Sequence, residues 1–183
     1  MGVRKIKQPA VFLDRDGVLN EAPVVRGVPS SPTTLQEFQW TPDAKASLQR
    51  LHKAGWLLIV VTNQPEVPRG KVTLENLEKI HQFMRKETPV KDIFSCVHDD
   101  KDDCGCRKPK PGMLLAAAEK WQIDLSRSWM VGDRWKDVQA GKTAGCRTIL
   151  IQADYSQPEK CPPDHAVSTL TQAADIILTQ AKR

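Results

Sequence analysis

Two aspartates two residues apart give this 183-residue chain its first chemical signal. Asp14 and Asp16 follow the apolar run 10–13 and precede Gly17. Because side chains i and i+2 of an extended segment point the same way, the two carboxylates can face one ligand. Oxygen ligands of this kind suit Mg²⁺. Taken alone, the string also fits an ordinary loop, since turns favour Asp and Gly for backbone reasons.

Polar residues also end two later apolar runs. Thr62 closes the second run, Asp133 closes the fourth, and Asp137 lies one helical turn beyond Asp133. The carboxyl ends of parallel strands meet at one sheet edge, so we expect these groups beside Asp14. There the Thr62 hydroxyl could bind a phosphate oxygen, and Asp133 could add a carboxylate to a cation. Each residue considered singly fits a turn or a helix cap, but together they predict a site for phosphate and Mg²⁺.

A cation is expected beside these carboxylates. Lys108 lies in the sequence Cys106-Arg107-Lys108-Pro109, between the third and fourth apolar runs. A carboxylate that attacks a phosphate monoester brings like charges together, so a fixed ammonium and Mg²⁺ would both lower the repulsion. We predict that Lys108 neutralises this charge. A solvated surface position is the alternative for Lys108 or Arg107 taken alone.

Three of the five cysteines lie close together with a histidine. Cys96, His98, Cys104 and Cys106 offer three thiolates and one imidazole. Four such ligands suit tetrahedral Zn²⁺ with no open coordination position, which predicts a structural zinc loop over about 96–106. Reduced thiols beside a surface histidine are the alternative.

Strand-like and helix-like segments alternate along the chain. Short apolar runs predict strands, helical periodicity predicts helices between them, and the order favours a Rossmann-like parallel α/β sheet flanked by helices. We expect one domain over 1–183, with a flap-like loop at about 21–40. The expected strands are 10–13, 56–61, 93–97, 128–131 and 148–151, and the expected helices are 42–54, 72–86, 111–121, 135–144 and 170–180.

The composition limits the classes of partner that the protein is expected to bind. The net charge is +5, and the basic residues are scattered without interleaved aromatics, so we expect no nucleic-acid partner. No window approaches 18 uncharged apolar residues, and residues 1–7 lack the apolar core of a signal peptide. We therefore expect a cytoplasmic protein without a membrane partner. The length and the closed zinc site fit a monomer.

The order of these motifs resembles the haloacid dehalogenase-like (HAD-like) hydrolase superfamily over roughly residues 10 to 137. The resemblance implies that Asp14 is a nucleophile that forms an aspartyl-phosphate and that Asp16 serves as general acid and then base. It also implies Mg²⁺ on Asp14, Asp133 and the backbone carbonyl of Asp16. For Asp16 to donate a proton near neutral pH, we expect its pKa to be raised. No large cap domain fits between these motifs.

The cysteine motif with Arg107, Lys108 and Pro109 resembles the histidinol-phosphate and heptose-bisphosphate phosphatase family. The segment 104–113 and Arg69-Gly70-Lys71 look more like the heptose-1,7-bisphosphate branch, whereas the short spacing from His98 to Cys104 is similar to the histidinol-phosphate branch. The resemblance implies a small phosphorylated sugar as substrate, with removal of its 7-phosphate. A non-catalytic phosphate-binding module is the alternative from another class. The implied substrate-binding residues are Arg15, Ala22, Pro23, Val24, Val25, Asn63, Gln64, Arg107 and Arg134.

Overall fold

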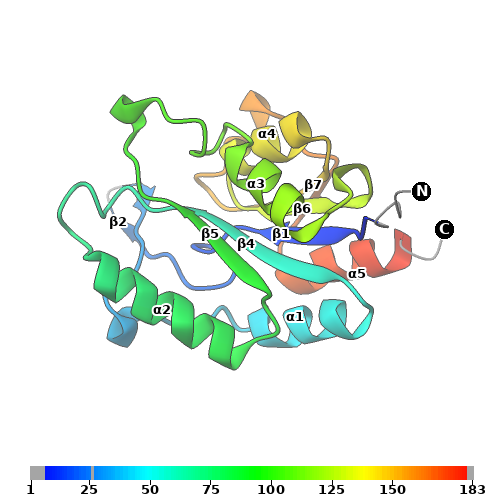
Figure 1. The fold of residues 1–183 in the computed structure, drawn as a ribbon, viewed down its shortest axis with the longest axis horizontal. Coiled ribbons are helices and arrows are strands. Elements are labelled where there is room, and N and C mark those ends of the chain that lie inside the picture. The colour runs from blue at the N-terminus through cyan, green and yellow to red at the C-terminus, as the bar shows by residue number, and fades with distance from the viewer. Residues whose placement is uncertain (1–6, 26, 181–183) are drawn as a thin grey trace, which may run out of the picture.

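Six parallel strands form the centre of the computed structural model, which describes residues 7–25 and 27–180 (Figure 1). Their order across the sheet is β5-β4-β1-β6-β7-β8. Strands covered on both faces are almost continuously apolar, which is why the apolar runs predicted them. The expected Rossmann-like layout is confirmed. The strands are β1 (Ala10–Leu13), β4 (Leu57–Asn63), β5 (Asp92–Cys96), β6 (Trp129–Gly132), β7 (Arg147–Ile151) and β8 (His165–Val167).

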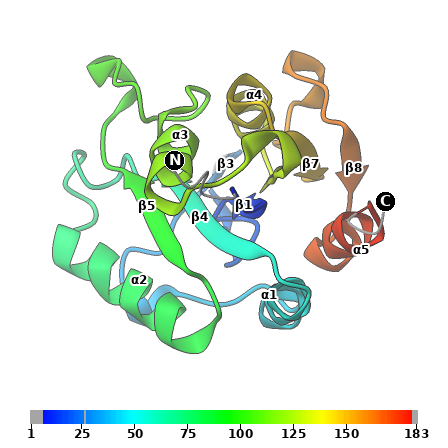
Figure 2. The same cartoon turned by 45° about the vertical axis from the view of Figure 1, so that its right-hand side comes forward.

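Helices cover both faces of the sheet (Figures 1 and 2). One face packs against α1 (Ala44–Lys53), α2 (Leu74–Glu87) and α5 (Leu170–Gln180), and the other against α3 (Gly112–Trp121) and α4 (Trp135–Ala144). Alternation along β1 divides its side chains between the two cores. Val11 and Leu13 enter the first core, and Ala10 and Phe12 enter the second.

The central position of β1 brings the polar strand ends together. Leu13 pairs with Val60 of β4 on one side and with Val131 of β6 on the other. The residues that follow β1 and β6, and the last residues of β4, therefore share one edge of the sheet. The structure extends β4 two residues beyond its predicted end, so that Thr62 and Asn63 belong to the strand.

Sequence periodicity missed the short strands. β8 has only three residues, too few to show an alternating pattern. The expected flap contains a hairpin of β2 (Val24–Val25) and β3 (Val28–Pro29), followed by a 3₁₀ turn, η1 (Leu35–Glu37). Phe38 then packs edge-on against Phe83 of α2, with ring centroids 5.8 Å apart. Between the predicted motifs, the described residues form this hairpin, strands and helices of the main fold, and loops rather than a separate cap domain.

The remaining observations concern residues away from the sheet edge. Cys146 and Cys161 are buried free thiols. No helix in the described ranges is long and apolar enough to cross a membrane. The expectation about the leader segment falls on residues 1–7, of which only Lys7 is described.

Candidate active site

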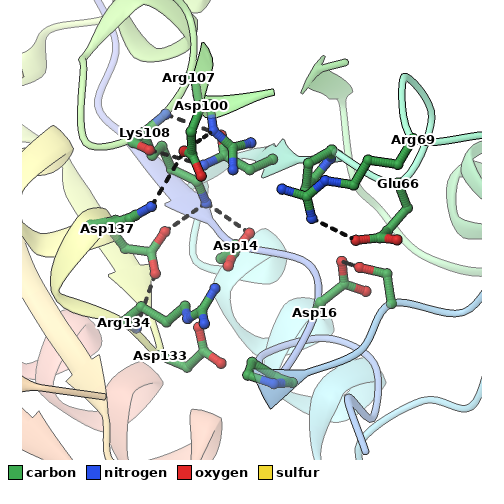
Figure 3. Close-up of a pocket in the computed structure, with 15 residues that line it drawn as sticks. Asp14, Asp16, Glu66, Arg69, Asp100, Arg107, Lys108, Asp133, Arg134 and Asp137 are labelled. Atoms are coloured by element: carbon green, nitrogen blue, oxygen red, sulfur yellow. Dashed lines mark hydrogen bonds and ion pairs between the residues drawn. The ribbon is translucent and has the colours of Figure 1, made fainter. Parts of the chain in front are cut away.

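Three buried carboxylates meet at the carboxyl edge of the sheet (Figure 3). Asp14 follows β1, Asp133 follows β6, and Asp137 lies in the first turn of α4. One oxygen of each lies within 4.8 Å of the others. The backbone N–H of Asp14 donates to the Val131 carbonyl across 2.9 Å, which continues the β1–β6 ladder and fixes the first carboxylate beside the second.

The ammonium group of Lys108 lies among these acids. It donates to Asp14 Oδ1 at 2.7 Å, to Asp137 Oδ1 at 2.6 Å and to the Val61 carbonyl at 2.8 Å, so all three protons have acceptors. Burial alone lowers the pKa of Lys108, but Asp137 and Asp14 outweigh it and raise the pKa above its usual value. Lys108 is therefore a fixed positive charge, in the place that the sequence predicted.

Asn63 positions the backbone of Lys108. Its side-chain amide donates to the Lys108 carbonyl at 3.0 Å and accepts from the Lys108 N–H at 3.0 Å. The residue predicted to bind substrate thus fastens the loop after the cysteine motif to the end of β4. It also lines the cavity.

Asp16 is surrounded by hydrogen-bond donors. The guanidinium of the fully buried Arg15 contacts Asp16 Oδ1 at 2.9 Å, and Asn20, Ser31 and Gln64 donate to its two oxygens at 2.8–2.9 Å. Burial raises the pKa of Asp16, but Arg15 and the hydrogen bonds outweigh it and hold the pKa below its usual value. The expectation of a raised pKa for Asp16 is therefore wrong for the free protein. The carboxylate is an ionised acceptor.

Thr62 and Gln64 lie beneath Asp16. Gln64 Nε2 donates both to Thr62 Oγ1, at 2.9 Å, and to Asp16 Oδ2, at 2.8 Å. Both side chains are buried and neither lines the cavity. Because the Thr62 oxygen accepts from Gln64, its hydroxyl proton is not used in this hydrogen bond.

The carboxylates fit a divalent cation. Asp133 Oδ1 is buried and has no hydrogen-bond partner among the described residues. Burial raises the pKa of Asp14 to about 7, with Lys108 opposing and Asp137 adding to the rise, and burial followed by Asp14 raises that of Asp133. A hard cation bound here would accept the unpaired Asp133 oxygen as a ligand and reduce the repulsion between the carboxylates.

Gly17 allows the backbone after β1 to pass close to the Asp133 carboxylate. Its φ is +83°, and a Cβ there would overlap Asp133 Oδ2 and crowd the Tyr155 hydroxyl. Only glycine combines this backbone conformation with so close an approach. The turn after β1 can therefore lie directly against Asp133.

A cavity of about 270 Å³ opens above these groups. Of the predicted site residues, Asp14, Asp16, Asn63, Arg107, Lys108, Asp133 and Arg134 line it. Pro29 of the hairpin and Ser31 just after it line the cavity, whereas the predicted Ala22, Pro23 and Val24 lie outside the lining. Val25 is the second residue of β2. Lining residues that the sequence did not single out as site residues are Pro29, Ser31, Pro65, Glu66, Arg69, Asp100 and Lys136.

Ion pairs join two loops along one wall of the cavity. Arg69 contacts Asp99 at 2.7 Å and Glu66 at 3.0 Å, and Arg107 contacts Asp100 at 2.7 Å. Acidic residues after His98 would suggest only a solvated loop tip. Instead, Asp99 and Asp100 hold two of the cations at the cavity.

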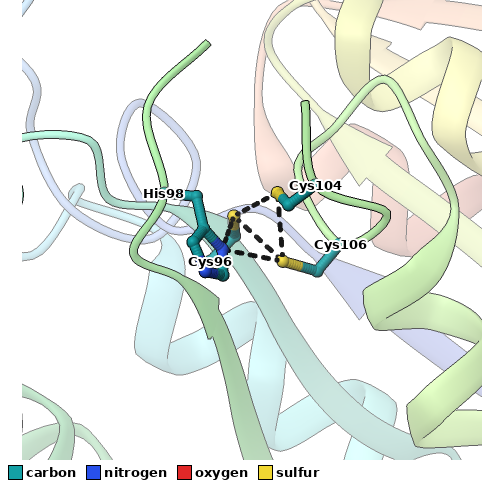
Figure 4. A group of neighbouring side chains, drawn as sticks. All are labelled: Cys96, His98, Cys104 and Cys106. Carbon is teal, nitrogen blue, oxygen red and sulfur yellow. Dashed lines mark hydrogen bonds between the residues drawn. The ribbon is translucent and has the colours of Figure 1, made fainter. Parts of the chain in front are cut away.

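The four predicted zinc ligands converge (Figure 4). The Sγ–Sγ distances among the three cysteines are 3.2–3.6 Å, and His98 Nδ1 lies 3.5 Å from Cys96 Sγ and 3.3 Å from Cys106 Sγ. Zn–S bonds of about 2.3 Å in a tetrahedron place sulfur atoms about 3.7 Å apart, so the residues fit zinc. The loop ends against α3, where a Cβ on Gly112 would overlap the Gly105 carbonyl.

Comparisons with known proteins identify the family of the chain. Residues 105–173 match the family model described as HAD-hydrolase-like. The chain is 37% identical over 147 residues to the D-glycero-β-D-manno-heptose-1,7-bisphosphate 7-phosphatase of Pseudomonas putida, which covers 78% of this chain and 81% of that protein. It is 38% identical over 156 residues to the protein of the same name from Vibrio cholerae, covering 79% and 81%.

A solved structure extends the likeness over nearly the whole fold. The D,D-heptose 1,7-bisphosphate phosphatase of B. bronchiseptica, complexed with magnesium and phosphate, aligns with a TM-score of 0.83 and 30% identity, over 94% of this chain and 99% of that one. The chain belongs to the heptose-bisphosphate phosphatase family of HAD-like hydrolases. It is therefore a phosphoric monoester hydrolase, and the predicted resemblance is confirmed.

Proposed function

We propose that this member of the heptose-bisphosphate phosphatase family removes the 7-phosphate of D-glycero-D-manno-heptose 1,7-bisphosphate in a Mg²⁺-dependent reaction. The observation that carries the proposal is the position of Asp14 beside Asp133. Lys108 holds one oxygen of Asp14, and Asp133 Oδ1 has no hydrogen-bond partner among the described residues. The names of the relatives supply the substrate, and the cations around the cavity suit its two phosphates.

The nucleophile is oriented by its neighbours. Asp14 Oδ1 accepts from Lys108 and from the Arg15 N–H at 2.8 Å, so Oδ2 is the oxygen that attacks phosphorus. The bond from phosphorus to the sugar oxygen breaks, and an aspartyl-phosphate forms on Asp14. Lys108, the Thr62 hydroxyl and backbone N–H groups at the sheet edge stabilise the charge on the transferring group.

Asp16 moves the protons. The entering phosphate places negative charge near this carboxylate and so raises its pKa from the low value of the free protein. Once protonated, Asp16 gives its proton to the departing sugar oxygen. The resulting carboxylate then takes a proton from the water that hydrolyses the aspartyl-phosphate, which restores Asp14.

Metals would act at two places. Asp14, Asp133 and the backbone carbonyl of Asp16 would hold Mg²⁺, which when bound neutralises charge on the phosphate. Asp137 would bind Lys108 rather than the metal. Its Oδ1 accepts from the ammonium, and its Oδ2 accepts from the Arg134 N–H at 3.0 Å. Structural Zn²⁺ on Cys96, His98, Cys104 and Cys106 would fix the loop that leads to Arg107 and Lys108.

We further propose that the protein is a cytoplasmic monomer with one domain over 1–183. Its partner would be a small sugar phosphate rather than a nucleic acid or a membrane. Its substrate-binding residues remain Arg15, the segment 22–25, Asn63, Gln64, Arg107 and Arg134, with Arg15 and Gln64 acting through Asp16.

Phosphate release from a substrate panel tests the proposal. The panel holds both anomers of the heptose bisphosphate and histidinol phosphate, each with Mg²⁺, and Asp14→Asn is the control. Faster phosphate release from the bisphosphate than from histidinol phosphate, with no release by Asp14→Asn, would support the proposed function. Preference for histidinol phosphate would keep the mechanism and replace the substrate, and no release from any compound would favour a phosphate-binding module.

A further inference from the structure

A hydroxyl group from the segment after the hairpin contacts the carboxylate of Asp16. Ser31, which follows β3 and lies 15 residues beyond Asp16 in the sequence, donates its hydroxyl proton to Asp16 Oδ2 at 2.8 Å. Both residues line the catalytic cavity. The bond therefore reaches the carboxylate from the cavity side, and no step of the proposed reaction uses it.

The other donors to this carboxylate belong to the protein interior. Arg15, Asn20 and Gln64 are fully buried, and none of them lines the cavity. The side-chain amides of Asn20 and Gln64 each make a second hydrogen bond at 2.9 Å, which holds them in place. Among the donors that residues 7–25 and 27–180 supply to Asp16, Ser31 is the half-buried one that shares the cavity with a substrate.

A hydroxyl differs chemically from these other donors. The N–H groups of a guanidinium or an amide only donate, whereas a hydroxyl both donates and accepts and can turn its proton without moving its oxygen. Asp16 gains and loses a proton during the proposed reaction. The Ser31 oxygen can therefore stay within hydrogen-bond distance of Asp16 Oδ2 before and after each proton transfer.

Hydrogen bonds on both sides of Ser31 fix the backbone that presents it. The Ser30 N–H and the Ser30 hydroxyl both donate to the Pro23 carbonyl, each at 2.9 Å. The Thr33 N–H and hydroxyl donate to Glu37 Oε2 at 2.7 and 2.8 Å. The Ser31 hydroxyl is thus held against the carboxylate before a substrate arrives, which lowers the cost of ordering the site.

We propose that Ser31 is a positioning residue for Asp16, which directs Oδ2 toward the oxygen of the departing sugar. The inference rests on the proposed function, because it takes Asp16 to be the general acid. As the bond from phosphorus to the sugar oxygen breaks, the proton passes from Asp16 to that oxygen. Ser31 neither supplies nor receives this proton, so its effect is confined to the step that Asp16 assists.

The dependence of the rate on the leaving group tests this role. A sugar alkoxide needs a proton as it departs, whereas p-nitrophenolate leaves as a stable anion and gains little from a general acid. For Ser31→Ala, kcat/KM should fall about tenfold with the heptose bisphosphate and by less than about twofold with p-nitrophenyl phosphate. Ser31→Thr retains the hydroxyl and should restore most of the activity toward the sugar.

Ser30→Ala is the matched control. It removes the neighbouring hydroxyl and a hydrogen bond within the hairpin, but no contact with Asp16. We expect it to keep the wild-type kcat/KM for both esters. If Ser30→Ala showed the same selective loss as Ser31→Ala, the effect would belong to the hairpin as a whole and the inference would be overturned.

Three further results would contradict the role of Ser31. The first is an equal fall for the two esters in Ser31→Ala, and the second is a Ser31→Thr variant as slow on the sugar as Ser31→Ala. The third comes from calorimetry in the Asp14→Asn background. There Ser31→Ala should leave the Kd of the heptose bisphosphate unaltered, and a tenfold weaker Kd would make Ser31 a substrate contact instead.

Failure of the proposed function would look different. If the wild type cleaved histidinol phosphate rather than the heptose bisphosphate, the substrate would change, and the same comparison with p-nitrophenyl phosphate would test Ser31. If the wild type released phosphate from none of these esters, the proposed function and the inference would both be overturned. Failure of the inference alone would leave wild-type turnover intact and appear only in the Ser31 variants.

Discussion

Tyr155 donates its hydroxyl proton to Asp133 Oδ2 across 2.8 Å. This bond joins the loop after β7 to the carboxylate at the end of β6. It occupies one oxygen of Asp133 and leaves the buried Oδ1 for a cation. Outer hydrogen bonds of this kind orient metal ligands and commonly matter to metal affinity.

Tyr155→Phe should therefore weaken Mg²⁺ binding. Loss of an outer hydrogen bond typically costs about 10–100-fold in metal affinity, and we expect the lower end because the phenyl ring still fills the same space. The measurement is the Mg²⁺ concentration for half-maximal phosphate release, with calorimetric Mg²⁺ titration as a readout independent of turnover. Thr88→Val removes a hydroxyl bond at the end of α2 and should leave both values unaltered. A normal Mg²⁺ titration in Tyr155→Phe would contradict this role.

Asp16→Asn should cost both activity and stability. Loss of the general acid and base lowers kcat by about 10²–10⁴-fold. The fully buried Arg15 would also lose its only anionic partner among the described residues, which costs roughly 3–5 kcal/mol. Urea unfolding measures the second effect. Ser31→Ala removes a hydrogen bond to Asp16 but keeps the charge pair, so it should destabilise by only about 1 kcal/mol. Equal losses in the two variants would count against the buried pair.

The sequence predicted the parts of the site that strand order determines. Asp14, Thr62 and Asp133 could be placed together because the ends of adjacent parallel strands must meet. The convergence of Cys96, His98, Cys104 and Cys106 was predictable because their residue types and short spacing limit the chemistry. No comparable rule predicts the contact of Tyr155 with Asp133, since the position of Tyr155 depends on the path of the loop after β7.

The misjudged pKa of Asp16 has a similar cause. Adjacent residues of an extended strand point to opposite sides, so nothing in the sequence suggested that Arg15 faces Asp16. Beyond β1 the chain turns, and the Leu19 N–H donates to the Arg15 carbonyl at 2.8 Å. Turn geometry decides this contact, as it does the pairing of Arg69 with Asp99.

Removal of a zinc ligand should loosen the loop before Lys108. Cys104→Ser is expected to lose bound zinc and roughly 3 kcal/mol of stability, which lowers Tm by about 6–12 °C for a chain of this size. It should also raise KM, since Arg107 and Lys108 follow directly. Metal analysis and thermal unfolding provide the measurements, and Cys146→Ala, a buried thiol outside the loop, is the control. Wild-type protein purified without chelators that contains no zinc would rule out the site.

His81 should make the protein acid-sensitive. Burial lowers the pKa of this α2 side chain to about 3, and Arg15 and Arg85 add to the effect while Asp16 opposes it. In the unfolded chain this histidine has an ordinary pKa near 6.5, so below that pH the unfolded state binds a proton that the folded state does not bind. The free energy of unfolding therefore falls as the pH drops below about 6.5. The slope from this one group is at most about 1.4 kcal/mol per pH unit.

Replacing His81 should flatten that dependence. His81→Leu keeps an apolar side chain in the buried position, and the variant should gain roughly 2 kcal/mol relative to the wild type between pH 7.5 and pH 5. Urea unfolding at both pH values measures the difference. His52→Gln, on the exposed side of α1, should follow the wild-type curve. Parallel stability curves for His81→Leu and the wild type would show that the histidine is protonated in the folded protein or that its burial is relieved by water.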